Sequence, residues 1–202
     1  VDGTWTDNEA SGSGGAIAMA GSAELVLDAS VFSGNGADSD GGAVYGAGDI
    51  EAADVSFTNN VARAGDGGAI GGDADLEVDG GTFDGNEARL GNGGAIGVEG
   101  DAQISGGRFT DNDANDSGGA VWSEGSSLEI WEGTFFRNTA GASGGGVCAS
   151  GVGDVSLTRS YLHGNAAKSG GAVTIQDVDV AGTLANLRVT DNVATQDGGG
   201  VW

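Results

Sequence analysis

The part of this chain that most resembles a metal site is the six-residue stretch Asp-Asn-Asp-Ala-Asn-Asp, which begins at Asp111. Asp111, Asp113 and Asn115 place carboxylate and amide oxygens at alternate positions, as calcium loops do. An EF-hand loop would also need Gly at its sixth position and Glu at its twelfth, where this chain has Asp116 and Trp122. We therefore expect weak calcium binding at most. The alternative is an ordinary polar turn, and the sequence requires no cofactor.

Catalytic chemistry has less support in the sequence. Glycoside cleavage needs paired carboxylates that act as acid and base, and none of the 30 Asp and Glu residues forms a pair that stands apart from the surrounding pattern. His163 is the single histidine and has no companion, so we expect a solvated surface side chain. Cys148 is the single cysteine, and we expect an exposed thiol without a histidine partner. These residues indicate that the protein is not an enzyme.

Four aromatic side chains are candidates for contact with a partner. Tyr45, Trp122 and Trp202 occupy one recurring position, which we expect to face outward, and Trp131 is expected to be exposed on another strand. An exposed aromatic ring can stack on a sugar or become buried against a protein. The four do not fall in consecutive repeats, so they predict a single carbohydrate contact or packing against a neighbouring molecule.

The charge of the chain excludes several classes of partner. Seven Lys and Arg stand against 30 Asp and Glu, which gives a net charge of −23. Nucleic acids and anionic membranes would be repelled by such a protein. No apolar run is long enough to span a bilayer, so we expect no direct membrane insertion.

All of these side chains are carried by one repeated framework. Eight times, an Asn follows a large apolar residue by three positions, and successive Asn residues are 25 to 27 apart. A fixed period of this length indicates a solenoid, in which each repeat buries its apolar side by stacking on its neighbours. The repeated Asn residues are Asn8, Asn35, Asn60, Asn86, Asn112, Asn138, Asn165 and Asn192.

Each repeat contains three segments that favour strands: one around the apolar residue, one at Gly-Gly-Ala-Ile/Val, and one with period-two alternation such as Leu76-Glu77-Val78-Asp79. Parallel pairing between coils would stack Phe32, Phe57, Phe83, Phe109 and Phe135 in one aromatic column. A second apolar column would contain Ile17, Val44, Ile70, Ile96, Val121, Val147, Val173 and Val201.

The repeated polar and glycine residues are expected to be structural. An amide in a thin core is costly unless it is hydrogen-bonded, so the Asn residues should form a ladder from coil to coil. The Gly-Gly pair should supply either positive φ or room for the backbone to pass close to a neighbour.

Phe-x-x-Asn and Gly-Gly-Ala-Ile/Val, recurring together, resemble the repeats of the polymorphic outer-membrane proteins of chlamydiae and related bacterial surface β-helix proteins. The resemblance covers essentially the whole chain, and it implies a right-handed parallel β-helix, surface exposure and an adhesin-like or autotransporter-passenger role. The glycine motif stands at 14–17, 41–44, 67–70, 93–96, 118–121 and 170–173, with Ala replaced by Gly at 144–147 and 198–201.

We therefore expect an all-β, right-handed parallel β-helix of about eight coils with three short strands per coil, forming one domain over residues 1–202 without its own caps. The expected function is an extracellular or outer-surface structural or adhesive protein. Its partners would be copies of itself stacked end to end into a filament, or a surface protein or glycan of a host or neighbouring cell. The alternative is a carbohydrate-active β-helix enzyme, a polysaccharide lyase or hydrolase.

Overall fold

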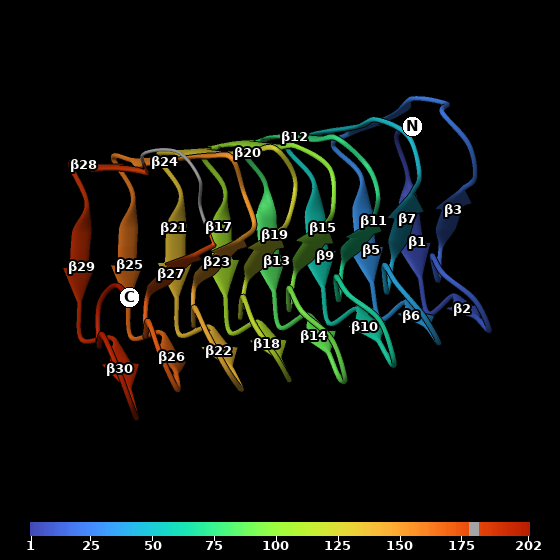
Figure 1. The fold of residues 1–202 in the computed structure, drawn as a ribbon. Helices are drawn as coiled ribbons and strands as arrows, with labels where there is room; N and C mark the ends of the chain where they lie inside the picture. Colours follow the sequence, from blue (N-terminus) through green and yellow to red (C-terminus); the bar gives the residue numbers. More distant parts are fainter. Residues whose placement is uncertain (178–181) are drawn as a thin grey trace.

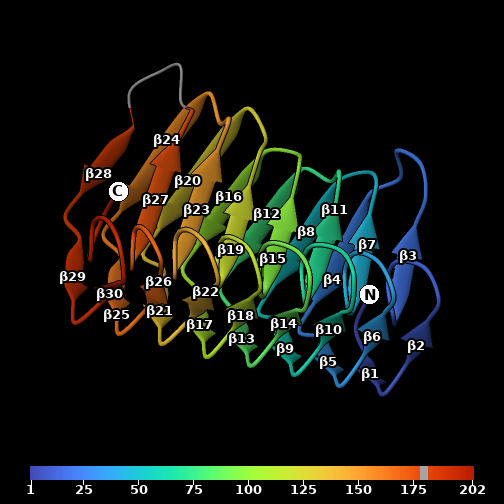
Figure 2. The same cartoon turned by 60° about the horizontal axis from the view of Figure 1, so that its bottom comes forward.

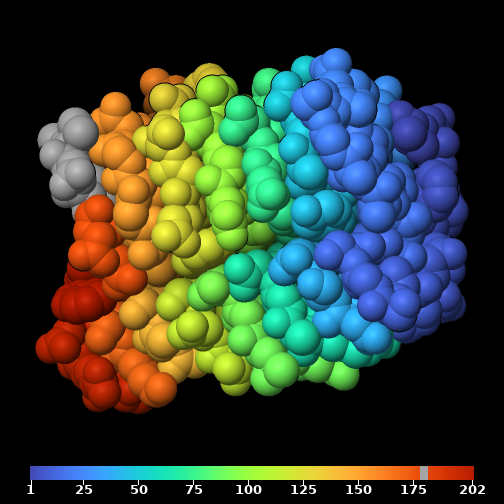
Figure 3. Space-filling model, turned by 45° about the vertical axis from the view of Figure 1, so that its right-hand side comes forward, coloured from blue at the N-terminus to red at the C-terminus, as the bar shows by residue number. Residues whose placement is uncertain are grey.

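The computed structural model describes residues 1–177 and 182–202, which form a β-solenoid of about seven turns without any helix. Each full turn adds one strand to each of four parallel sheets, A to D, and the strands of a sheet follow one another in chain order along the axis (Figures 1 and 2). In the space-filling view, successive coils form adjacent bands from blue to red (Figure 3). The predicted all-β parallel solenoid is confirmed, whereas the prediction of three strands per coil is wrong.

The fourth strand of each coil is a two-residue strand that begins directly after the repeated Asn, and these strands make sheet B. Sheet A consists of β1 (Thr4–Thr6), β5 (Val31–Ser33), β9 (Ser56–Thr58), β13 (Thr82–Asp84), β17 (Arg108–Thr110), β21 (Thr134–Phe136), β25 (Tyr161–His163) and β29 (Arg188–Thr190). Sheet B consists of β2 (Glu9–Ala10), β6 (Gly36–Ala37), β10 (Val61–Ala62), β14 (Glu87–Ala88), β18 (Asp113–Ala114), β22 (Thr139–Ala140), β26 (Ala166–Ala167) and β30 (Val193–Ala194).

Sheets C and D hold the strands that follow the Gly-Gly pair and the alternating segment. Sheet C consists of β3 (Ile17–Met19), β7 (Val44–Gly46), β11 (Ile70–Gly72), β15 (Ile96–Val98), β19 (Val121–Ser123), β23 (Val147–Ser150) and β27 (Val173–Gln176). Sheet D consists of β4 (Leu25–Asp28), β8 (Ile50–Ala53), β12 (Leu76–Asp79), β16 (Ala102–Ser105), β20 (Ser127–Trp131), β24 (Asp154–Thr158) and β28 (Thr183–Ala185).

The core is one side chain deep and is organised in columns. In sheet A the five phenylalanines from Phe32 to Phe135 are register partners, are fully buried, and stack with ring centroids 4.6–5.2 Å apart. In sheet C the column from Ile17 to Val173 is likewise in register, and an isolated bridge from Val173 to Val201 extends it. Both predicted columns are confirmed. Fully burying such a side chain contributes about 1.5–3 kcal/mol, so each added coil stabilises its neighbours.

The Asn side chains form a hydrogen-bonded ladder through this core. Asn112 shows the arrangement: its Oδ1 accepts bonds from the backbone N–H and from Nδ2 of Asn86, each at 3.0 Å. Its Nδ2 donates to Oδ1 of Asn138 at 2.9 Å and to the carbonyl oxygen of Phe83 at 3.0 Å. The buried amide therefore donates two hydrogen bonds and accepts two, which offsets the free-energy cost of burying a polar group in the core.

The two residues of each Gly-Gly pair have different roles. The first glycine of all eight pairs has a φ between 58° and 70°, a region in which a side chain is strained. The second glycine lies against the next coil: a Cβ added at Gly94 would be 2.2 Å from the carbonyl oxygen of Gly119. We expected the pair to supply either positive φ or room for close backbone approach. The structure has both, the positive φ at the first glycine and the close approach at the second.

Asn112→Ala should lower the free energy of unfolding by about 3 kcal/mol or more, because it leaves buried groups of Asn86, Asn138 and Phe83 without partners at about 1–3 kcal/mol each. Urea unfolding followed by circular dichroism measures this loss. Asn115→Ala is the matched control, since Asn115 is exposed and such surface changes cost within about 0.5 kcal/mol. Equal losses in the two variants would contradict a stabilising ladder.

Candidate functional site

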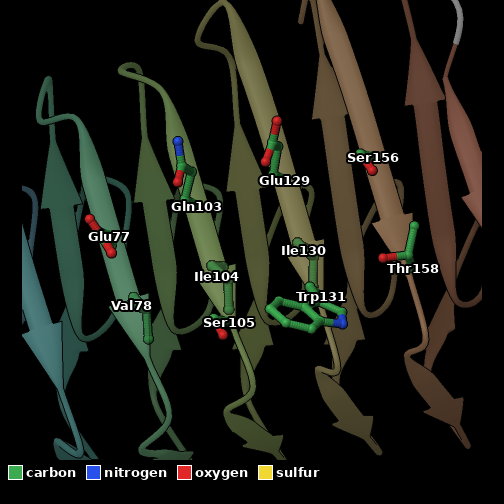
Figure 4. A pocket seen from close by; sticks show the side chains of 10 residues that line it. All are labelled: Glu77, Val78, Gln103, Ile104, Ser105, Glu129, Ile130, Trp131, Ser156 and Thr158. Atoms are coloured by element: carbon green, nitrogen blue, oxygen red, sulfur yellow. The ribbon is translucent and has the colours of Figure 1, made fainter.

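An open groove of about 280 Å³ crosses the outer face of sheet D from β12 to β24 (Figure 4). We call it the sheet D groove. Two outward columns in register form its walls, the first running Glu77, Gln103, Glu129 and Ser156, and the second Ser105, Trp131 and Thr158. The alternation of these strands buries Val78, Ile104 and Ile130 beneath them. The groove is therefore a polar surface with a single large aromatic ring.

Trp131 is positioned by the alternation of β20. Leu128 and Ile130 face the core, so Glu129 and Trp131 must face solvent. The Trp131 side chain is 48 % exposed, as expected from the sequence. The guanidinium carbon of Arg159 lies 5.7 Å from the centroid of its ring, and Arg159 also pairs with Glu132 at 3.5 Å. A half-exposed indole held by a flat sheet is suited to stacking on a planar or ring-shaped ligand.

A second depression of about 270 Å³ continues the sheet D groove toward the N-terminal coils. It is lined by Asp49, Ile50, Glu51, Asp75, Leu76, Glu77, Asp101 and Gln103. Two of its carboxylates hold the backbone: Asp75 accepts a hydrogen bond from the N–H of Asp101, and Asp101 accepts one from the N–H of Ser127, each at 2.8 Å. The neighbouring carboxylate of Glu24 raises the pKa of Glu51. Neither groove lining includes an arginine, so this end of the face is strongly acidic.

The other predicted aromatic contacts do not lie in this groove. Trp122 was expected to be exposed, and that expectation is wrong because its exposure is 7 %. Tyr45 is partly buried, and burial followed by the charges of Asp73, Asp40 and Glu99 raises the pKa of its phenol. Trp202 is 49 % exposed at the C-terminal edge. Of the four, only Trp131 lines the groove.

Cys148 was also expected to be exposed and is instead fully buried. It occupies the outward column of sheet C as the register partner of Trp122, but the turns that lead into sheet C fold over this face. The same covering is seen at Gly97, where an added Cβ would be 2.6 Å from the backbone nitrogen of Gly67. Burial raises the pKa of the Cys148 thiol to about 12, against a lowering effect of its hydrogen bond with Ser117.

His163 is not a freely solvated side chain either. Its ring contacts Phe136 of the neighbouring coil and Tyr161 of the same strand, with ring centroids 5.2 and 5.7 Å away. Its Nδ1 lies 2.9 Å from Oγ1 of Thr190 and 3.2 Å from a carboxylate oxygen of Asp191. These contacts give the histidine a structural role in an aromatic stack on the outer face of sheet A.

The carboxylate of Asp111 is bound by an arginine. Arg137 donates Nε to Oδ1 at 2.7 Å and a terminal nitrogen to Oδ2 at 2.5 Å, and these bonds lower the pKa of Asp111. Asp113 has its pKa raised by partial burial and then by Glu87, and Asn115 is exposed. Within the described residues, no group of three or more His, Cys, Asp or Glu side chains is placed to hold a metal ion. Calcium binding at this loop stays a prediction.

Two segments of this chain are similar to a repeat found in known proteins. Residues 29–47 and 54–73 match the Chlamydia polymorphic membrane protein repeat. The matched segments contain β5, β7, β9 and β11, with the Asn and the Gly-Gly pair of two adjacent coils, so the resemblance inferred from the sequence is confirmed. No curated protein and no solved structure matches the chain. Over the described residues, no helix has the length and apolar character needed to cross a bilayer.

Cys148 should resist alkylation in the folded protein. With a thiol pKa near 12 and a fully buried sulfur, almost no accessible thiolate exists at pH 8. A thiol-reactive dye at pH 8 should label the native protein less than one hundredth as fast as the urea-unfolded protein, as followed by mass spectrometry. Rapid stoichiometric labelling of native protein with unchanged circular dichroism would show that sheet C is uncovered.

Proposed function

We propose that this chain is a non-enzymatic cell-surface β-solenoid whose sheet D groove is an adhesive site for a glycan. The match to a membrane-protein repeat supports a surface location. The repeated Asn, Phe and Gly residues have structural roles in the coil. Residues that differ from one repeat to the next are therefore the candidates for ligand recognition. The observation that carries the proposal is the half-exposed Trp131 in a groove otherwise lined by polar side chains.

The groove favours a neutral or amine-bearing saccharide over an acidic one. Glu77 and Glu129 line it with no arginine in the lining, and the net charge of the protein is −23, so a polyanion would be repelled. The amide of Gln103 and the hydroxyls of Ser105 and Thr158 can exchange hydrogen bonds with sugar hydroxyls. Strand spacing makes the groove about 14 Å long from β12 to β24, which suits an elongated oligosaccharide.

Turnover of the saccharide has less support than binding. A general acid needs a carboxyl whose environment keeps it protonated near neutral pH. Glu77 and Glu129 are both exposed and are separated by Gln103 in the same column. Incubating the protein with the bound oligosaccharide and analysing products by mass spectrometry tests this directly, and we expect no cleavage.

Trp131→Ala should weaken binding of a neutral oligosaccharide, such as a tetrasaccharide of N-acetylglucosamine, by at least tenfold, about 1.4 kcal/mol. The loss follows from removal of the stacking surface, and Trp131→Phe should restore part of it. Isothermal titration calorimetry measures the affinities. Leu90→Ala is the control, since Leu90 is 67 % exposed and lies outside the groove. Equal affinity of wild type and Trp131→Ala, or no binding across a panel of neutral and amino-sugar oligosaccharides, would refute this function.

A second candidate function, end-to-end assembly, is favoured by the polarity of the Asn ladder. Each coil donates from its Asn to Oδ1 of the Asn in the next coil, as Asn165 does to Asn192. Within the described residues, this ladder runs from Asn8, whose Oδ1 accepts no hydrogen bond, to Asn192, whose backbone N–H donates none. We propose that a second copy, stacked in register, joins these complementary edges and continues the columns of Val189 and Val201 onto Trp5 and Ile17.

Val189→Lys should prevent this assembly, because it places a charge in the apolar column at one edge. Light scattering of the 202-residue chain should show a mass that rises with concentration for wild type and a constant monomer mass for the variant. Leu90→Lys adds the same charge away from both edges and should assemble like wild type. A wild type that stays monomeric at every concentration would contradict stacking between copies.

A further inference from the structure

A third hollow, of about 380 Å³, lies on the outer face of sheet A and has a composition unlike that of the sheet D groove. Its volume falls in the range of small-ligand sites, about 300–1,000 Å³. We call it the sheet A groove. It is lined by Thr58, Thr82, Asp84, Arg108, Thr110, Asp111 and Arg137.

Two of the few basic residues of this acidic protein, Arg108 and Arg137, line the sheet A groove. Of the seven Lys and Arg residues, only Arg63 and Arg89 precede Arg108, so five of the seven fall between Arg108 and Arg188. The lining itself has two arginines and two aspartates, and is therefore electrically balanced. This balance distinguishes it from the sheet D groove, where carboxylates are the only charged groups.

The two arginines of the groove are in different states. Arg137 is held by both carboxylate oxygens of Asp111, and its guanidinium carbon lies 4.3 Å from the centroid of the Phe136 ring. Arg108 forms no ion pair within residues 1–177 and 182–202, and its guanidinium carbon lies 5.9 Å from the same ring. The guanidinium of Arg137 is therefore engaged by Asp111, whereas the guanidinium of Arg108 can donate hydrogen bonds to a ligand.

Thr110 adds an independent sign of a ligand. It lines the groove, its residue is only 8 % exposed, and its hydroxyl oxygen has no hydrogen-bond partner among the described residues. A buried hydroxyl without a partner is costly, and such a group calls for an explanation in a folded protein. An oxygen atom of a ligand at the base of the groove would supply the missing bond once the Thr110 hydroxyl turned toward it.

We propose that the sheet A groove binds the carboxylate-bearing unit of an acidic saccharide. Arg108 takes the carboxylate in the two-pronged geometry that a guanidinium favours. The hydroxyls of Thr58, Thr82 and Thr110 and the carboxylate of Asp84 bond the sugar hydroxyls.

One free guanidinium matches one carboxylate per sugar unit. A peptide rich in Asp and Glu would bring further charges against Asp84 and Asp111. It would also find no free strand edge within the groove, because the backbone of β13 and β17 is paired on both sides. The proposal rests on the surface role proposed above but uses a face separate from the sheet D groove.

The test compares sialyllactose with lactose, its neutral counterpart, by calorimetry and saturation-transfer NMR. Wild type should bind sialyllactose at least tenfold more tightly than lactose, and Arg108→Ala should remove that preference. Arg108→Lys keeps the charge but not the planar donor, so it should retain only part of the preference. Arg89→Ala is the matched control, since Arg89 is exposed, pairs with Glu87 at 3.0 Å and does not line the groove. Circular dichroism confirms that each variant is folded.

Three results would overturn the proposal: equal binding of lactose and sialyllactose, unchanged binding by Arg108→Ala, or tighter binding of a glutamate-rich peptide that depends on Arg108. Trp131→Ala separates the two sites. It should leave sialyllactose binding intact. A wrong assignment of the glycan site on sheet D and a wrong assignment of the sheet A groove would therefore give different binding results across the variants. Loss of sialyllactose binding in Trp131→Ala with retention in Arg108→Ala would place the acidic sugar on sheet D instead.

Discussion

The structure depends on a buried amide that can satisfy its hydrogen bonds only when the coils are in register. Asn112 has four bonds, two accepted from Asn86, one donated to Asn138 and one donated to the carbonyl of Phe83. A slip of one residue between coils would leave these groups unpaired in an apolar interior, at a cost of about 1–3 kcal/mol for each. The ladder thereby aligns the phenylalanine column three residues earlier, and it places each Gly-Gly pair where the next coil passes too close for a side chain. Apolar burial drives the stacking, and the amides determine its register.

The strict register also distinguishes the residues that build the coil from those that can contact a ligand. Residues at equivalent positions lie above one another, so a repeated side chain produces a uniform column and an unrepeated one produces a local feature. Trp131 stands between Ser105 and Thr158 in its column, and Arg108 follows Thr82 in another. Neither makes a contact that the coil needs, in contrast to the Asn and Gly residues. The two grooves on sheets D and A are therefore departures from the repeat that the scaffold tolerates because outward positions have little part in its stability.

The sequence was sufficient for the solenoid, its parallel pairing and its apolar columns, because each repeats with one period. It did not reveal the fourth strand, since two residues such as Glu87–Ala88 are too short to show an alternation. Trp122 and Cys148 were misplaced for a different reason: alternation predicts that a side chain points away from the core, but not that a turn covers it. Gly71 and Gly97, which stand in the same column, could have indicated this, because repeated glycines at an outward position suggest that another stretch of backbone lies directly over it. The partner of Asp111 could also have been found, since Arg137 follows it by 26 residues, one coil along.

The coil spacing that relates Asp111 to Arg137 explains how one acidic scaffold can present two chemically different faces. Residues one period apart become neighbours, so a single substitution in one repeat changes the surroundings of two adjacent coils on one sheet only. Arg137 pairs with Asp111 on sheet A, beside Arg108 and Asp84 in the same groove, while the lining around Glu77 and Glu129 on sheet D contains no basic side chain. Because the sheets share a core but not an outer surface, charge on one face has little effect on the other beyond a Debye length of about 8 Å at physiological salt. The proposed recognition of neutral and acidic sugars therefore assigns each ligand to its own sheet of the same few coils, without altering the ladder that holds them.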